Sequence, residues 1–163
     1  ETVIPAELVK KYLKTSVDKI VEVHQGKVWQ GSALAGGISF NAHFANIIAA
    51  AFAATGQDLA HIVDSSQGYS LFEKQGEDLY VSVSLPSLML GHVGGGTGLR
   101  KQKQARDLML TDLNSKKLPE GNFSAVLAEV IAAAVLCGEI SLHAALSVDD
   151  HVTAHESLGK ARP

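Results

Sequence analysis

Five glycines fall within the eight residues 91–98, near the middle of this 163-residue chain. An alternating apolar segment, residues 79–85, precedes them, and a basic, helix-prone segment, residues 100–106, follows. A strand, a glycine loop and a helix in this order present backbone N–H groups to an anion, because glycine adopts positive φ and lets the backbone approach a ligand. The spacing fits neither GxGxxG nor GxxxxGK[ST]. An anion-binding loop and a long turn over a sheet edge therefore both stay open from the residues alone.

Composition narrows the class of protein. Hydrophobic residues make up 46% and charged residues 19% of the chain, which predicts one folded domain with a buried core. A net charge of −3 argues against broad nucleic-acid binding. The single cysteine, Cys137, excludes a disulfide framework and a thiolate metal cluster, and favours a reducing, intracellular setting. The chain opens on Glu1 without an initiator methionine or a visible signal peptide, so we expect it to be part of a longer protein.

The first third of the chain predicts helices around a loop. Residues 5–23 have apolar side chains at helical spacing with lysines between them, which predicts one amphipathic helix. Residues 27–40 are rich in Gly, Ser and Ala and predict a loop that can lie against a ligand. Residues 41–55 predict a second helix, capped by Asn41 and ended by Gly56. Asp58 then predicts the cap of a short helix through residue 63.

The remainder predicts a small sheet and a long helix. Residues 69–85 contain two alternating runs joined at 75–78, which indicates a hairpin leading into the glycine stretch. A helix is expected at 102–109, and residues 123–148 form a long Ala-rich run. Because Glu129, Glu139 and His143 interrupt this run, a buried helix is favoured over a membrane segment. The predicted fold class is α+β, with helices packed on a small antiparallel sheet and a long buried central helix.

The residues alone leave the chemistry weakly defined. Seven histidines suggest a metal, and the pairs Glu139/His143 and His151/His155 have helical spacing. HExxH is absent and no third ligand is indicated, so we expect no metal. No GxSxG elbow occurs for a serine hydrolase. A His/Asp acid–base pair beside an anion-binding glycine loop remains.

Four motifs together are more specific. Residues 41–46 read NAHFAN, 55–58 read TGQD, 91–97 read GHVGGGT and 137–142 read CGEISL. In this order they resemble the 3-hydroxy-3-methylglutaryl-CoA (HMG-CoA) reductase family, most closely the class found in eukaryotes and archaea. The resemblance covers essentially the whole chain. It implies an oxidoreductase of the mevalonate pathway that reduces HMG-CoA to mevalonate and free CoA with two NADPH.

The resemblance also implies roles for single residues. The glycine stretch resembles the second NADP(H) motif of the family, with His92 where threonine is usual; its cofactor-binding residues are Gly91, Val93, Gly94, Gly95, Gly96 and Thr97. Asp58 resembles the catalytic aspartate of the TGQD motif, which holds a lysine–glutamate network in the protonation state that polarises the carbonyl. His155 resembles the catalytic histidine that protonates the leaving CoA thiolate, a task suited to imidazole. The implied substrate-binding residues are Lys27, His43, Asn46, Leu142 and Leu146.

Other parts of the family pattern are absent from this chain. It contains no ENVIG motif with the catalytic glutamate, no DAMGMN motif of the small NADP-binding domain, and no segment with the catalytic lysine. Residues 1–163 therefore correspond to the C-terminal portion of the large, CoA-binding catalytic domain. Negligible turnover is expected from them alone.

The expected partners are HMG-CoA or CoA, the missing N-terminal part of the catalytic domain, and further copies in a homodimer or tetramer, without nucleic acid. The expected location is the cytoplasm, or the cytosolic face of a membrane if an anchor lies upstream. The alternative is a non-catalytic module derived from this fold that binds CoA or a nucleotide or mediates dimerisation.

Overall fold

The structure is a computed structural model that describes residues 1–91, 93–110 and 123–148. The chain forms two compact units. The first, here called the sheet unit, contains residues 1–42, 69–83 and the chain from Leu136 onward. The second, the glycine-loop unit, contains residues 43–68 and 84–135. Each is described by itself.

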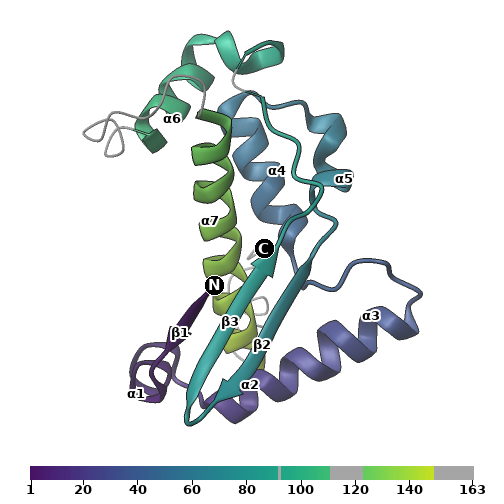
Figure 1. The fold of residues 1–163 in the computed structure, drawn as a ribbon, viewed down its shortest axis with the longest axis vertical. Helices are drawn as coiled ribbons and strands as arrows, with labels where there is room; N and C mark the ends of the chain where they lie inside the picture. Colours follow the sequence, from purple (N-terminus) through teal and green to yellow (C-terminus); the bar gives the residue numbers. More distant parts are fainter. Residues whose placement is uncertain (92, 111–122, 149–163) are drawn as a thin grey trace, which may run out of the picture. The chain divides into compact units, whose positions relative to one another are not determined.

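The sheet unit is built on a three-stranded antiparallel sheet in the order β1-β3-β2 (Figure 1). Strands β2 (Tyr69–Gln75) and β3 (Asp78–Ser84) form the predicted hairpin, with Gly76 at a φ of 64° in its turn. Strand β1 (Thr2–Ile4) was not predicted, and it pairs antiparallel with β3, with Val3 opposite Tyr80. The core cluster of this unit contains Val9, Val17, Ile20, Phe72, Leu79, Val81 and Ala144.

The N-terminal helical region differs from its prediction. Helix α1 (Ala6–Leu8) continues through a π-helical turn (Val9–Leu13) and stops at Lys14, whose φ of 59° is left-handed. Helix α2 (Val17–Val23) starts anew after Ser16, whose side chain accepts a hydrogen bond from the N–H of Lys19 at 3.4 Å. The single helix predicted over 5–23 is therefore wrong, because the left-handed residue interrupts it.

The loop predicted over 27–40 is also wrong in its first half. Helix α2 continues through a π-helical segment (His24–Gln30) into α3 (Gly31–Leu34), so the helical rod ends only at Leu34 (Figure 1). His24 and Val28 are buried at helical spacing, and this buried face stabilises a segment whose small residues favour a loop.

The glycine-loop unit is mainly helical. Helix α4 (Phe44–Thr55) is followed by a 3₁₀ turn (Leu59–His61) and α5 (Ile62–Ser65). A second 3₁₀ turn (Gly95–Gly98) leads into α6 (Arg100–Leu110), which packs on α4. Asn41 does not cap α4 as predicted: the helix begins after His43, and the Asn41 amide instead donates to Ser39 Oγ at 2.8 Å.

The long helix predicted near the C-terminus is confirmed as α7 (Phe123–Ser147). Its residues up to Val135 belong to the glycine-loop unit and its later residues to the sheet unit. By length and composition alone α7 is long and apolar enough to cross a membrane, a criterion that core helices of soluble proteins also meet. Its later half carries the buried Glu139 and His143. The α+β class, with a small antiparallel sheet and a long helix, is confirmed.

Candidate functional site

The end of α4 meets the glycine stretch through a contact between two glycines. Gly56 ends α4 in the left-handed conformation, with φ 74°. A Cβ on Gly56 would lie 2.4 Å from the carbonyl oxygen of Gly96, and a Cβ on Gly96 would lie 3.2 Å from that of Gly56. Position 56 therefore requires glycine, both because its φ is positive and because a Cβ would clash with Gly96. The contact holds the TGQD turn against the glycine stretch.

Gln57 fixes the start of the same stretch. Its buried side-chain amide donates to the carbonyl oxygen of Gly91 at 2.8 Å and accepts from the N–H of Gly91 at 2.9 Å. These two bonds satisfy both the N–H and the carbonyl oxygen of Gly91, as a neighbouring β-strand would. Just upstream, the N–H of Met89 donates to Ser65 Oγ at 3.1 Å. Hydrogen bonds thus attach the glycine stretch to the residue after α4, and the segment just before the stretch to the end of α5.

These contacts create a hollow of about 340 Å³ in the glycine-loop unit. Asp58 and His61 line it together with residues of the glycine stretch; the lining from that stretch is Gly91, Val93, Gly94, Gly95 and Thr97. Asp58 caps the 3₁₀ turn as predicted, since its Oδ1 accepts from the N–H of Ala60 at 2.9 Å. Its other oxygen, Oδ2, lies 3.9 Å from His61 Nε2, and 67% of its side chain is exposed. The carboxylate is therefore both a cap and an open group at the site.

A second hollow, of about 310 Å³, lies along the same glycines and is lined by Lys103 and Arg106 of α6. Lys103, which composition singled out, also forms an ion pair with Asp107 one turn along α6. Arg100 and Lys101 do not line either hollow. Gly94 and Gly95 have φ of 93° and 57°, and a Cβ on Gly94 would meet nothing within 4 Å. Open backbone beside two cationic side chains is the arrangement that suits a phosphorylated ligand.

The substrate-binding residues implied by the resemblance fall in both units. His43 and Asn46 lie at the start of α4, where the N–H of Asn46 donates to the carbonyl oxygen of His43 at 3.1 Å. Lys27 is exposed on the helical rod, and Leu142 and Leu146 are half-buried on α7, all three in the sheet unit. His92 and the predicted catalytic His155 lie outside the described residues.

The sheet unit also contains a buried polar cluster that the sequence did not predict. Trp29 Nε1 donates to His24 Nε2 at 2.9 Å, His24 Nδ1 lies 3.2 Å from His143 Nε2, and His143 Nδ1 lies 2.7 Å from the carbonyl oxygen of Glu139. The Phe72 ring packs on both imidazoles, with ring centroids 4.9 Å from His24 and 4.2 Å from His143. Burial and the neighbouring His143 lower the pKa of His24 from 6.5 to about 4, against an opposing backbone hydrogen bond at Ser70.

Glu139 connects this cluster to the segment before α4. Its carboxylate is fully buried, and its two oxygens accept the N–H of Ala42 at 3.2 and 3.0 Å. The spacing of Glu139 and His143 marked them as a pair in the sequence, but nothing local indicated that His24, 119 residues earlier, completes the cluster. Among the described residues no group of three or more His, Cys, Asp or Glu side chains is placed to hold a metal ion.

Comparison with known proteins gives one consistent family. The hydroxymethylglutaryl-coenzyme A reductase family model matches residues 1–160. The chain is 51% identical over 160 residues to the 3-hydroxy-3-methylglutaryl-coenzyme A reductase of Aeropyrum pernix, covering 98% of this chain and 38% of that protein. It is 44% identical to the Methanothermobacter thermautotrophicus reductase, again covering 98% and 38%. For Cannabis sativa reductase 1 the identity is 44%, covering 99% and 28%. The chain thus spans less than two fifths of the length of these relatives.

Proposed function

The chain belongs to the hydroxymethylglutaryl-coenzyme A reductase family, and we propose that it forms the C-terminal part of the large catalytic domain of an NADPH-dependent reductase that converts HMG-CoA to mevalonate and CoA. The observation that carries the proposal is the shared hollow of Asp58 and the glycine stretch. Because the chain spans 38% of its archaeal relatives, the catalytic lysine and glutamate come, in this proposal, from the rest of a longer chain, here called the parent reductase.

The glycine stretch fits a dinucleotide phosphate. Gly94 presents its backbone to open space, and Lys103 and Arg106 line the neighbouring hollow with positive charge. In the proposal Gly91, Val93, Gly94, Gly95, Gly96 and Thr97 hold the cofactor, and NADPH supplies the hydride when it is bound. Gly96 lines neither hollow, and its part in the proposal is indirect, because it makes the contact with Gly56.

In the proposal, polar residues orient the charged groups that act on the substrate and supply a proton to its leaving group. Asp58, fixed at one oxygen by the N–H of Ala60, presents a carboxylate that orients the lysine and glutamate of the parent reductase. His155 donates the proton to the departing thiolate of CoA, since an imidazole titrates near neutral pH. In the sheet unit, Lys27 pairs with the acyl group and Leu142 and Leu146 form an apolar wall. His43 and Asn46, at the start of α4 in the glycine-loop unit, also bind the substrate in this proposal.

The same proposal covers assembly and location. The parent reductase acts as a homodimer or tetramer, in the cytoplasm or on the cytosolic face of a membrane. The isolated chain turns over HMG-CoA negligibly, because it lacks the electrophilic lysine.

The test is HMG-CoA-dependent oxidation of NADPH by the parent reductase, wild type and Gly95→Val. Because Gly95 lines both hollows, the valine branches would occupy space proposed for the cofactor, and KM for NADPH should rise at least about tenfold. Gly76→Val is the matched control: its φ of 64° resembles that of Gly95, and a Cβ there meets nothing within 4 Å. An unchanged KM for NADPH in a folded Gly95→Val protein would show that the glycine stretch is a turn that does not bind the cofactor. Wild-type protein that binds NADPH or CoA without turnover supports the non-catalytic module instead.

A further inference from the structure

The three hydrogen bonds of the buried cluster have one direction. An indole N–H only donates, so His24 Nε2 must be the bare acceptor, and a neutral His24 then holds its proton on Nδ1. That proton points at His143 Nε2, which must also be bare. A carbonyl oxygen only accepts, so the Nδ1 of His143 carries its proton toward Glu139. The contacts therefore assign the same tautomer, Nδ1–H, to both imidazoles.

Another proton on either imidazole would break the order of donors and acceptors in this hydrogen-bond chain. A proton on His24 Nε2 would face the N–H of Trp29, and one on His143 Nε2 would face the N–H of His24. Among the described residues, β2 contributes Ser70 and the Phe72 ring to these surroundings, and α7 contributes Glu139, whose carboxylate accepts the N–H of Ala42. Glu22 and Lys27 flank His24 on its own helix and are exposed. The hydrogen bonds are satisfied only while both imidazoles are neutral.

This cluster ties together the segments that carry the proposed substrate residues of the sheet unit. His24 lies three residues before Lys27 on the helical rod. His143 follows Leu142 directly on α7 and lies three residues before Leu146. Glu139, one turn earlier, holds Ala42, the residue before His43. The His24–His143 bond joins the rod directly to α7, so its loss would remove one fixed link between the segment of Lys27 and the segment of Leu142 and Leu146.

We propose that Trp29, His24 and His143 are positioning residues that fix Lys27 relative to Leu142 and Leu146 through an uncharged, one-directional hydrogen-bond chain. The inference rests on the proposed function, because it concerns the binding of the acyl group. It goes further by assigning a role to three residues that do not themselves contact the substrate. Trp29, with 38% of its surface exposed, ends the chain at the side open to solvent.

Two substitutions at His24 distinguish the loss of its hydrogen bonds from the loss of its side-chain volume. His24→Leu removes both bonds and leaves the N–H of Trp29 without its acceptor. His24→Asn keeps a side-chain N–H near the position of Nδ1, so the bond to His143 is retained while the bond from Trp29 is lost. Gln25→Ala, at the exposed neighbouring position of the same helix, is the control. All are made in the parent reductase, and circular dichroism with thermal unfolding checks that each variant is folded.

The tautomers are read independently of turnover. Two-bond proton–nitrogen correlation spectra of histidine-labelled parent reductase should show two imidazoles as neutral Nδ1–H forms at pH 8 and still at pH 6, with the His24 signals missing in His24→Asn. An Nε2–H form of either ring, or a charged ring at pH 6, would contradict the proposed hydrogen-bond chain.

Steady-state kinetics test the positioning role. In His24→Leu, KM for HMG-CoA should rise about tenfold, the effect of leaving buried partners unpaired, whereas KM for NADPH stays within about twofold. His24→Asn should recover most of the affinity, and Gln25→Ala should match wild type. An equal rise in both KM values, or an unchanged KM for HMG-CoA in folded His24→Leu, overturns the role. If wild-type protein shows no reductase turnover, the proposed function fails and the positioning role fails with it, whereas the tautomer spectra still decide whether the chain exists.

Discussion

The sheet unit and the glycine-loop unit organise their candidate residues in opposite ways. Around His24 and His143 the groups are mostly side chains, and the two buried imidazoles are held by hydrogen bonds of one direction. Around Asp58 the groups are mostly backbone, open to solvent, and held by the glycine contact and the Gln57–Gly91 pair. The first arrangement is sensitive to a single proton, and the second to a single methyl group. Three predictions test this contrast.

The largest effect is expected from Gly56→Ala. The new Cβ would lie 2.4 Å from the carbonyl oxygen of Gly96, and alanine is strained at the φ of 74°. Strain and overpacking together should lower the free energy of unfolding by about 3–5 kcal/mol, measured by urea denaturation. Gly76→Ala isolates the strain, because its φ of 64° is similar and a Cβ there is in open space. We expect a loss of about 1 kcal/mol for this control. Equal losses in the two variants would contradict a clash at Gly56.

A smaller effect is expected from pH in the sheet unit. The folded-state pKa of His24 is lowered from 6.5 to about 4, so the unfolded chain binds this proton first as the pH falls. Stability linked to His24 is therefore complete above pH 6.5 and is lost between about 6.5 and 4, by about 3 kcal/mol in total.

The measurement is urea denaturation of wild type and His24→Asn at several pH values across this window. The variant is expected to be less stable at pH 7 but to lose less stability on acidification. Parallel pH profiles for the two proteins would contradict the assignment of a depressed pKa to His24.

The smallest effect is expected from Lys103→Gln. Lys103 is exposed and forms an ion pair with Asp107 that is also exposed, so the substitution should change the free energy of unfolding by less than about 0.5 kcal/mol. KM for NADPH should rise about threefold at low ionic strength and less in salt, because exposed charges are screened. Lys101→Gln, at an exposed position that lines neither hollow, is the control. A salt-independent change, or the same change in both variants, would show that Lys103 has no particular part in the site.

Local signals in the sequence predicted much of the fold. The hairpin, the long helix α7, the end of α4 at Gly56 and the Asp58 cap all depend on side chains within a few residues, and all are confirmed. Apart from the Asn41 cap, three predictions failed, and at these places distant packing or backbone conformation decides the structure. Lys14 adopts a left-handed φ, which a lysine in the sequence does not predict. The rod over 24–34 is stabilised by burial of His24 and Val28. Strand β1 depends on pairing with residues far along the chain.

The site divides in the same way. Resemblance to a family linked Asp58 to the glycine stretch, and the structure adds the two contacts that join them. Gln57 and Gly91 are 34 residues apart and His24 and His143 are 119 apart, so neither pairing has a local signature. The roles of Lys27, His43, Asn46, Leu142, Leu146 and His155 stay predictions.

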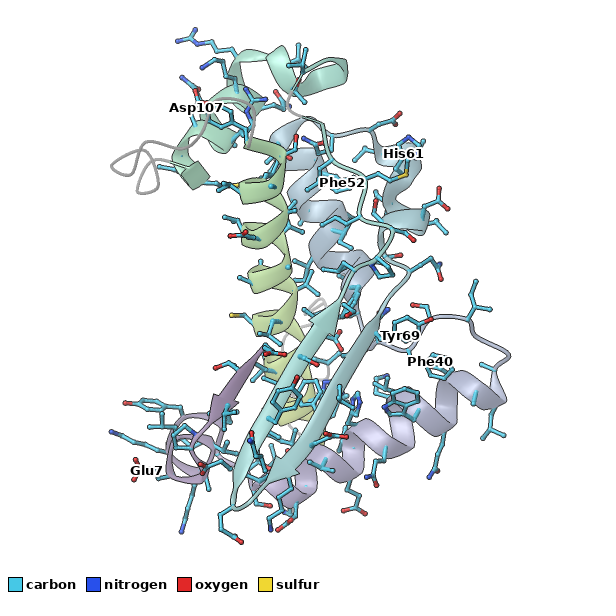
Figure 2. All side chains as sticks on the ribbon, in the orientation of Figure 1. Glu7, Phe40, Phe52, His61, Tyr69 and Asp107 are labelled. Atoms are coloured by element: carbon cyan, nitrogen blue, oxygen red, sulfur yellow. The ribbon has the colours of Figure 1, made fainter. Side chains whose placement is uncertain are left out.

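The segment between α3 and α4, which contains Phe40, has a consequence for the edge of the sheet. Strand β2 is an outer strand, and Phe40 forms a parallel bridge to its first residue, Tyr69, with the N–H of Ser70 donating to the carbonyl oxygen of Phe40 at 2.8 Å. Figure 2 shows the two labelled rings lying together, with centroids 6.1 Å apart. Further along the strand, Lys74 pairs with Asp18 of α2. Backbone pairing at one end and charge at the other protect this edge from adding a strand of another molecule, which is how folded proteins avoid aggregation through exposed sheets.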